Sequence, residues 1–216
     1  RLGPEGGQVF ALVRCGQTVA APISSGVLMV GPDLKTQKLS GSLRGTMDLC
    51  PLPNPDALLA ATDEGLSLIR RRGRSWTASA LADAPDRIRY LCPDPAGDGF
   101  WGYREYLGLI HFTLNGDRTA VRELRTFGPK EGLESPGHVR PIVFQDHLIL
   151  TGTARPRLWD GRSWHFWEQL ERHFQELHLS IPYDLQPDGT DSLLFLNEEG
   201  AGRITTPFEP GKTRVQ

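Results

Sequence analysis

Short apolar segments of four to six residues recur along the chain, and polar turns separate them. The recurring unit is an apolar strand, a turn, a second apolar strand, a turn, a glycine and a third apolar strand. The glycine is clearest at Gly26, Gly65 and Gly108, which lie 39 and 43 residues apart. A degenerate fourth copy covers Arg155–Trp159, and a fifth covers Ala201–Thr205 with its glycine at Gly202. Segments of this length, bounded by Gly, Pro, Asp and Asn, predict short antiparallel strands.

The period of the repeat indicates how these strands are arranged. Four-stranded β-propeller blades have a period of about 40–50 residues, and stacking of neighbouring blades buries both of their apolar faces. A β-sandwich would not need the same glycine–apolar pattern five times. We therefore predict an all-β fold, a β-propeller of four-stranded antiparallel blades, with about five blades across residues 1–216. The innermost strands are predicted at Val9–Val13, Met47–Cys50, Ile88–Cys92, Val139–Phe144 and Tyr183–Leu185.

One segment, residues 167–177, departs from the strand pattern and contains no Gly or Pro. Trp167, Leu170, Phe174 and Leu177 fall on one helical face. The spacing predicts a short helix between the fourth and fifth blades, packed by this face on the rim of the propeller. The alternative is a helix that binds a partner.

Composition narrows the class of protein. Glycine (24) and proline (17) make up nearly a fifth of the 216 residues, against about 12% on average, so turns are frequent. The net charge of −2 shows no basic excess of the kind that nucleic-acid binding requires. No run approaches the ~20 apolar residues that span a bilayer. The sequence starts at Arg1 without a signal segment, so we expect a chain excised from a longer protein, with any export signal or membrane anchor in other segments.

Three cysteines, Cys15, Cys50 and Cys92, cannot all pair with one another. Cys50 and Cys92 both stand in a Leu-Cys-Pro context, which favours a repeated buried position. A Cys50–Cys92 disulfide and a reactive or metal-binding thiol are the alternatives, so the redox compartment stays open.

The repeat resembles the two-component regulator propeller repeat. The resemblance rests on Leu59–Leu66 and on Phe127–Ser135, the second of which is similar to the Gly-Leu-Pro-Ser linker between blades of that family. It covers nearly the whole chain through short motifs. The fourth copy departs from the pattern because it lacks the glycine, and the fifth has Asn197–Gly200 where Gly-Thr is expected.

The resemblance implies a part of a larger, seven-bladed propeller. In that family the propellers form the periplasmic or extracytoplasmic sensing region of hybrid histidine kinases, often kinases that respond to products of polysaccharide breakdown. The partners would then be the remaining blades, the downstream signalling domains and a small ligand, with membrane attachment only through segments outside this sequence. The family supplies no motif of binding residues to transfer.

The candidate ligand-binding residues are aromatic. Trp101, Tyr103, Tyr106 and Trp159 lie near second and third strands, where rings could reach the mouth of a propeller and stack on a sugar. The alternative is core packing between blades. We predict a non-catalytic sensory module that binds an oligosaccharide or another small ligand and uses no cofactor.

Two alternative functions remain, a carbohydrate-active enzyme (glycoside hydrolase or lyase) and a protein-interaction scaffold. Glycoside hydrolysis requires paired carboxylates, and Asp48, Asp94 and Asp184 stand on or just after innermost strands. Acids at strand ends also stabilise turns by binding the backbone. We therefore predict that these three do not converge and that the segment has no catalytic residue.

Other polar motifs have simple structural interpretations. The intervals between His165, His173 and His178 fit no zinc site, so no metal is predicted. The stretch Asp160–Trp164 partly resembles a sialidase Asp-box, but its Asp adjoins the Gly. The basic run Arg70–Arg74 could bind an anion, and a solvated hairpin tip that opposes edge pairing is the simpler interpretation. Nucleotide-binding glycine motifs and the Gly-x-Ser-x-Gly nucleophile motif are lacking.

Overall fold

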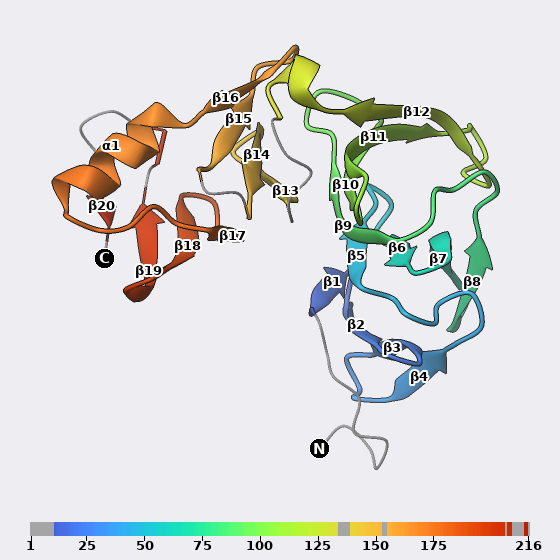
Figure 1. Ribbon diagram of the computed structural model, residues 1–216. Coiled ribbons are helices and arrows are strands. Elements are labelled where there is room, and N and C mark those ends of the chain that lie inside the picture. Colours follow the sequence, from blue (N-terminus) through green and yellow to red (C-terminus); the bar gives the residue numbers. More distant parts are fainter. Residues whose placement is uncertain (1–10, 134–138, 153–154, 206, 209–213, 216) are drawn as a thin grey trace. The chain divides into compact units, whose positions relative to one another are not determined.

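Five four-stranded antiparallel sheets, each in chain order, make up the structure (Figure 1). The computed structural model describes residues 11–133, 139–152, 155–205, 207–208 and 214–215. The chain consists of two compact units. The first consists of residues 1–93, 99–105 and 110–125, and the second of residues 94–98, 106–109 and 126–216. We call the five sheets blades 1 to 5 in chain order.

The first unit holds blades 1 and 2 and most of blade 3. Blade 1 consists of β1 (Val13–Cys15), β2 (Thr18–Ile23), β3 (Gly26–Val30) and β4 (Thr36–Leu39). Blade 2 consists of β5 (Asp48–Pro51), β6 (Ala57–Thr62), β7 (Gly65–Arg72) and β8 (Ser75–Ala80). Blade 3 consists of β9 (Ile88–Pro93), β10 (Phe100–Arg104), β11 (Gly108–Leu114) and β12 (Val121–Phe127).

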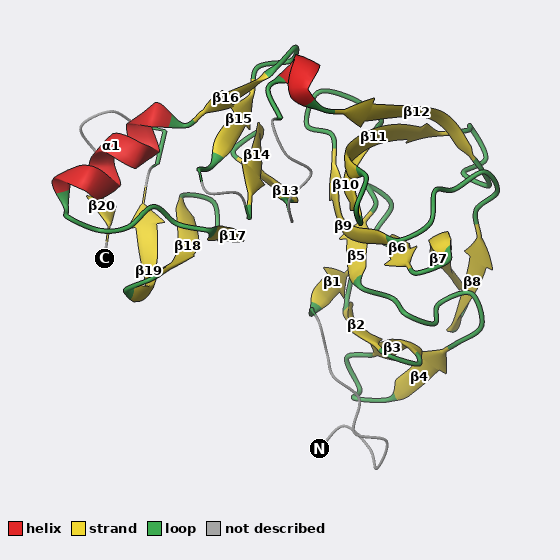
Figure 2. Ribbon diagram, in the orientation of Figure 1, coloured by secondary structure: helices red, strands yellow, loops and turns green. Residues whose placement is uncertain are grey.

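The second unit holds blades 4 and 5 and the α-helix of the described residues (Figure 2). Blade 4 consists of β13 (Arg140–Phe144), β14 (His147–Thr151), β15 (Arg157–Trp159) and β16 (Trp164–Phe166), and a 3-10 turn η1 (Pro129–Glu131) precedes it. Helix α1 (Glu168–Glu176) follows blade 4. Blade 5 consists of β17 (Asp184–Asp188), β18 (Ser192–Asn197), β19 (Gly200–Thr205) and β20 (Arg214–Val215).

The predicted order of strands is confirmed, and the bounds of the innermost strands need correction. The first ends at Cys15 and not at Val13, because Cys15 pairs with Thr18 across a two-residue turn. The start of that prediction, Val9, lies outside the described residues. The last innermost strand, predicted over Tyr183–Leu185, extends to Asp188, which pairs with Ser192. In both places the hairpin register sets the strand end.

The repeated glycine opens the third strand after a two-residue turn. In blades 1, 2 and 5 it has a φ of 144°, 139° and 142°, which glycine adopts most readily. A Cβ on Gly26 would lie 1.9 Å from the carbonyl oxygen of Leu39. In blade 5 this position belongs to Gly200, which pairs with Asn197. The prediction of Gly202 is wrong by two residues.

Side-chain alternation in β6 shows how blades pack in the first unit. Every residue of β6 is buried, and successive side chains of a strand point to opposite faces. Leu58 and Ala60 belong to the core shared with blade 1, and Leu59 and Ala61 to the core shared with blade 3. The innermost strand β5 contacts both β1 and β9. Blades 1 to 3 therefore stack face to face as in a β-propeller, and a total of seven blades stays a prediction.

Helix α1 is part of the core of the second unit. Leu170 and Phe174 are buried together with Leu185 and with Phe195, whose ring centroid is 5.0 Å from that of Phe174. Leu177, predicted on the same face, follows the helix end and is 45% exposed. The predicted helix between blades 4 and 5 is therefore confirmed, and the chain itself occupies its apolar face, because Trp167, Leu170 and Phe174 share one core with residues of both blades.

The cysteines and two tryptophans are core residues. Cys15, Cys50 and Cys92 are buried thiols, which confirms the preferred interpretation over a disulfide. Burial, and secondarily the charge of Asp48, raises the pKa of Cys50 to about 12. Trp76 and Trp164, which occupy the same place in blades 2 and 4, are 6% and 3% exposed. No described helix is long and apolar enough to cross a bilayer.

Candidate functional site

The acid on the innermost strand of blade 2 is bound to backbone groups. Asp48 begins β5, and its carboxylate accepts hydrogen bonds from the amides of Leu49 and Leu91, both at 2.9 Å. Leu91 lies in β9, so the carboxylate joins the innermost strands of two neighbouring blades. A carboxylate that accepts hydrogen bonds from two backbone amides is suited to holding strands together.

The other two predicted acids also have local structural contacts. Asp94 follows β9, and its Oδ1 accepts a 3.0 Å bond from the amide of Ala96 within the turn to β10. Asp184 begins β17, and its Oδ1 lies 3.9 Å from Nη1 of Arg140 in β13. The described residues contain no group of three His, Cys, Asp or Glu side chains that could hold a metal. That the three acids do not converge on a substrate stays a prediction.

An ion network joins blades 2 and 3 at one end of their strands. Arg89 of β9 contacts Asp63 in the β6–β7 turn at 2.9 Å and Glu105 after β10 at 2.6 Å. Burial lowers the pKa of Arg89, and the two carboxylates more than offset this, Glu105 first. The Arg89 side chain is 21% exposed and that of Glu105 is 16% exposed, so this network is partly desolvated. It fixes two loops at this end of the first unit.

The four predicted ligand-binding aromatics differ in burial. Trp101 and Tyr103 of β10 are each 2% exposed, and the Trp101 ring centroid is 4.8 Å from that of His111. Tyr106, in the β10–β11 turn, is 72% exposed. Trp159 is half-buried in β15. Trp101 and Tyr103 therefore fill the core, whereas Tyr106 offers an open ring. Contact with a sugar stays a prediction.

The turn that follows β15 brings a serine, a histidine and an aspartate together. His165 Nε2 lies 2.6 Å from Asp160 Oδ2 and 2.9 Å from Ser163 Oγ. A catalytic triad uses the two different ring nitrogens for its two contacts, so one shared nitrogen does not activate the serine. The amides of Ser163 and Arg162, followed by His165, lower the pKa of Asp160 to about 2. The cluster is an exposed turn stabilised by Asp160.

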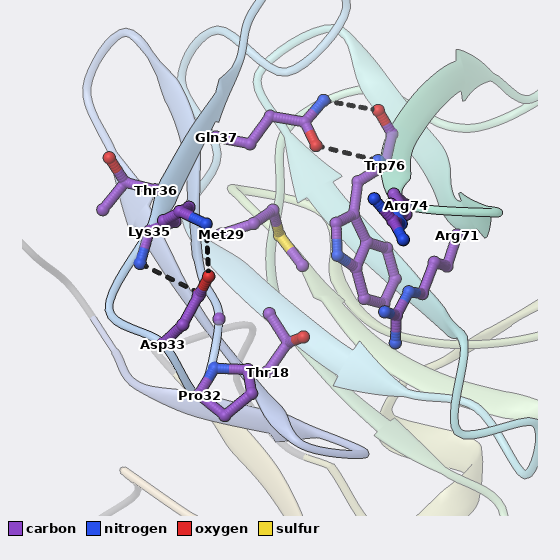
Figure 3. A pocket seen from close by; sticks show the side chains of 11 residues that line it. Thr18, Met29, Pro32, Asp33, Lys35, Thr36, Gln37, Arg71, Arg74 and Trp76 are labelled. Atoms are coloured by element: carbon purple, nitrogen blue, oxygen red, sulfur yellow. Dashed lines mark hydrogen bonds and ion pairs between the residues drawn. The ribbon is translucent and has the colours of Figure 1, made fainter.

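A hollow of about 530 Å³ lies in the first unit between the outer strands of blades 1 and 2 (Figure 3). Lys35 lines it from the β3–β4 turn, and Arg71 and Arg74 line it from β7 and the β7–β8 turn. Across these strands, the Gln37 amide group donates to the Trp76 carbonyl and accepts from the Trp76 amide, both at 2.8 Å. The pair of bonds holds β4 against β8 and defines one wall of the hollow.

Sequence reasoning missed this hollow. It noted the run Arg70–Arg74 and passed over Asp33, Lys35 and Gln37. These residues lie about one repeat period before the arginines and tryptophan that they face. The period itself was the available signal, because residues one period apart occupy equivalent places in adjacent blades.

Solved structures similar to this chain include extracellular domains of two putative hybrid two-component systems of Bacteroides thetaiotaomicron. The similarity to BT4673 has 16% identity and a TM-score of 0.66 and covers 100% of this chain and 28% of that one. The similarity to BT3049 has 12% identity and a TM-score of 0.66 and covers 91% and 27%. PorZ, a bacterial surface component of the type IX secretion system of Porphyromonas gingivalis, has 14% identity, a TM-score of 0.59 and coverages of 97% and 26%.

No protein-family model matches the sequence, and no curated protein matches it. The chain spans between a quarter and a third of the length of the three solved chains just named. At identities of 12–16% these similarities concern the fold. The chain shares its fold with these extracellular domains of putative hybrid two-component systems.

Proposed function

We propose that this chain is a non-catalytic sensory module of a two-component signalling protein, that it works outside the cytoplasm, and that it binds a small ligand such as an oligosaccharide. The observation that carries the proposal is the fold shared with the BT4673 extracellular domain across 100% of this chain. In this proposal, further blades of a seven-bladed propeller and a histidine kinase belong to the rest of the protein.

The contacts of the acids support a non-catalytic role. Asp48 and Asp94 direct carboxylate oxygens at backbone amides at 2.9 and 3.0 Å. A general acid or nucleophile of a glycosidase instead needs its oxygens directed at the glycosidic bond. Occupation by backbone donors therefore favours binding over hydrolysis.

A scaffold for other proteins is the second candidate function. It is supported by the similarity to PorZ, a component of a secretion system, which covers 97% of this chain. A scaffold would need no small ligand, so a ligand screen separates the two candidates.

The test is a thermal-unfolding screen of the purified chain against neutral and acidic oligosaccharides, with the products analysed for hydrolysis. A ligand at about 100 times its Kd should stabilise the protein by about 2.7 kcal/mol, and we expect no turnover. Tyr106→Ala should weaken binding if this ring contacts the ligand, and Leu107→Ala, at the next exposed position, is its matched control. Turnover that is lost in Asp94→Asn would establish the enzyme instead, and neither binding nor turnover would favour the scaffold.

A further inference from the structure

The arginines of the basic run in blade 2 (Arg70–Arg74) do not all point the same way: one contacts blade 3, and two face blade 1. Arg70 directs Nη2 to the carbonyl oxygen of Asp117 in blade 3, at 2.9 Å. Arg71, the next residue of the strand, points to the opposite face, as successive strand residues do, and lines the hollow beside blade 1. Arg74, beyond the strand end, lines the same hollow (Figure 3). Two arginines of the run, both exposed to solvent, therefore line one open hollow.

The charges around the hollow do not balance. Lys35 is paired with Asp33 across 3.0 Å, and this pairing lowers the pKa of Asp33. Arg71 donates from Nε to the carbonyl of Gly73, and its Nη1 is 3.7 Å from Asp56. That distance exceeds the 2.7–2.9 Å or so of a charge-assisted hydrogen bond. Within the described parts of the chain, Arg74 has no hydrogen-bond or ion-pair partner. Two guanidinium groups are therefore left with weak compensation or none.

The walls of the hollow are formed without a ligand. The two 2.8 Å hydrogen bonds of Gln37 fix β4 beside β8, and the buried side chains of Met29 and Trp76 contribute apolar surface to the lining. A ligand that enters would not have to order these strands, so the ordering cost of binding is low. The volume of about 530 Å³ lies within the ~300–1,000 Å³ range of small-molecule sites.

We propose that this hollow binds a small ligand bearing a carboxylate, sulfate or phosphate group, with Arg71 and Arg74 as the residues that recognise its charge. A guanidinium presents donors in a planar fork that fits the oxygens of all three groups. The site lies at the outer strands, apart from the predicted aromatics of β10. The proposal is independent of whether the protein is a sensor.

Isothermal titration calorimetry on the full chain tests the proposal. The probes are glucuronate, galactose 6-sulfate and glucose 6-phosphate, with glucose and galactose as neutral controls and inorganic sulfate and phosphate as free anions. We expect the charged sugars or the free anions to bind and the neutral sugars not to bind. Binding should weaken as ionic strength rises above about 0.15 M, because salt screens partly exposed charges. Binding of the inorganic anions alone would identify a free anion as the ligand.

Variants of the same run show whether the hollow is the site. Arg74→Gln should weaken binding by about tenfold or more, the effect of losing a charged hydrogen bond, and Arg74→Lys should retain part of the affinity. Arg72→Gln is the matched control, because Arg72 is exposed and does not line the hollow. Unfolding curves verify that each variant is folded. Absence of binding by every anion, or an equal loss in Arg72→Gln and Arg74→Gln, would overturn the proposal.

Discussion

Blades 2 and 4 have the same order of four strands but differ in strand length and in burial. In blade 2 every residue of β6 is buried, and β7 extends over eight residues from its opening glycine. In blade 4 the third and fourth strands have three residues each, and β15 is only half-buried. The loop before β15 begins with Gly152, but no glycine opens β15 as Gly65 opens β7, and five residues separate Thr151 from Arg157 instead of two.

Aromatic and cationic side chains compensate for the short strands of blade 4. The guanidinium carbons of Arg155 and Arg157 lie 3.7 and 4.2 Å from the centroid of the Phe166 ring. The ring centroids of Trp159 and Trp164 lie 5.2 Å apart. Helix α1 adds the apolar surface that longer strands would supply. A blade can therefore lose its sequence signature and still keep four antiparallel strands in chain order.

The largest expected effect tests whether the helix substitutes for strand surface. Phe174 is fully buried, and Phe174→Ala should lower the free energy of unfolding by about 3–5 kcal/mol. Leu177→Ala, at the exposed position just after the helix, should change it by about 0.5 kcal/mol or less. Denaturant unfolding measures both. Similar small losses in both variants would show that α1 is not part of the core.

The next largest expected effect is a difference in stability loss between alanine substitutions of the glycines that open the third strands of blades 1 and 5. Both have a φ near 140°, but a Cβ on Gly26 would meet the Leu39 carbonyl oxygen at 1.9 Å, whereas one on Gly200 would meet no atom of the described residues within 4 Å. Gly26→Ala should cost about 3 kcal/mol or more, and Gly200→Ala about 1–2 kcal/mol from backbone strain alone. Denaturant midpoints decide this, and a larger loss for Gly200→Ala would contradict the described packing of β3 on β4.

These glycines also show what the sequence could predict. Gly65 is predictable because the same glycine followed by apolar residues recurs at Gly26, 39 residues earlier. In blade 5 the sequence offers Gly200 and Gly202 two residues apart, and only the pairing of Gly200 with Asn197 distinguishes them. Hydrophobic periodicity defines which segments are strands, and hydrogen-bond register defines which residue opens each one.

The candidate sites were harder to predict because they depend on contacts between blades. The sequence could not show that Trp101 is buried beside His111, since either face of β10 could have held an aromatic ring. It also could not show that Arg71 faces Lys35 and Arg70 faces Asp117, because strand alternation assigns the faces only after the register is known. The local turn at Asp160 was visible, and its histidine contact was not.

A smaller expected effect is a pH-dependent stabilisation of the hairpin turn in blade 4, which the equivalent turn of blade 2 lacks. Asp160 precedes Gly-Arg-Ser-Trp in blade 4, and Arg72 precedes the same four residues in blade 2. The folded pKa of Asp160, about 2, is below the ordinary value of about 3.9. Its stabilisation of the turn is therefore present above that ordinary value and is lost as pH falls through the folded pKa.

Amide NMR signals report this difference. Ser163, whose amide donates to Asp160 at 2.7 Å, should shift with a midpoint well below pH 3.9 or so, and Ser75 in blade 2 should not follow this titration. Asp160→Asn should abolish the transition. In His165→Ala the pKa of Asp160 should stay lowered, because hydrogen bonds from backbone amides are the larger cause of the shift. A midpoint at the ordinary aspartate value would refute the described turn.

The smallest expected effect is the labelling of the three thiols by a thiol reagent in the native protein. All three thiols lie in blades 1 to 3. At pH 8 a thiol with the pKa of Cys50, about 12, is about one part in ten thousand thiolate, the reactive form. Burial and the charge of Asp56 also raise the pKa of Cys15, and its Sγ lies 2.9 Å from the Pro55 carbonyl oxygen, as a hydrogen-bond donor. We expect a thiol reagent such as DTNB to label the native protein very slowly and to count three thiols after denaturation. A count of one would reveal a disulfide, and rapid labelling of the native protein would show that a blade interface of the first unit opens to solvent.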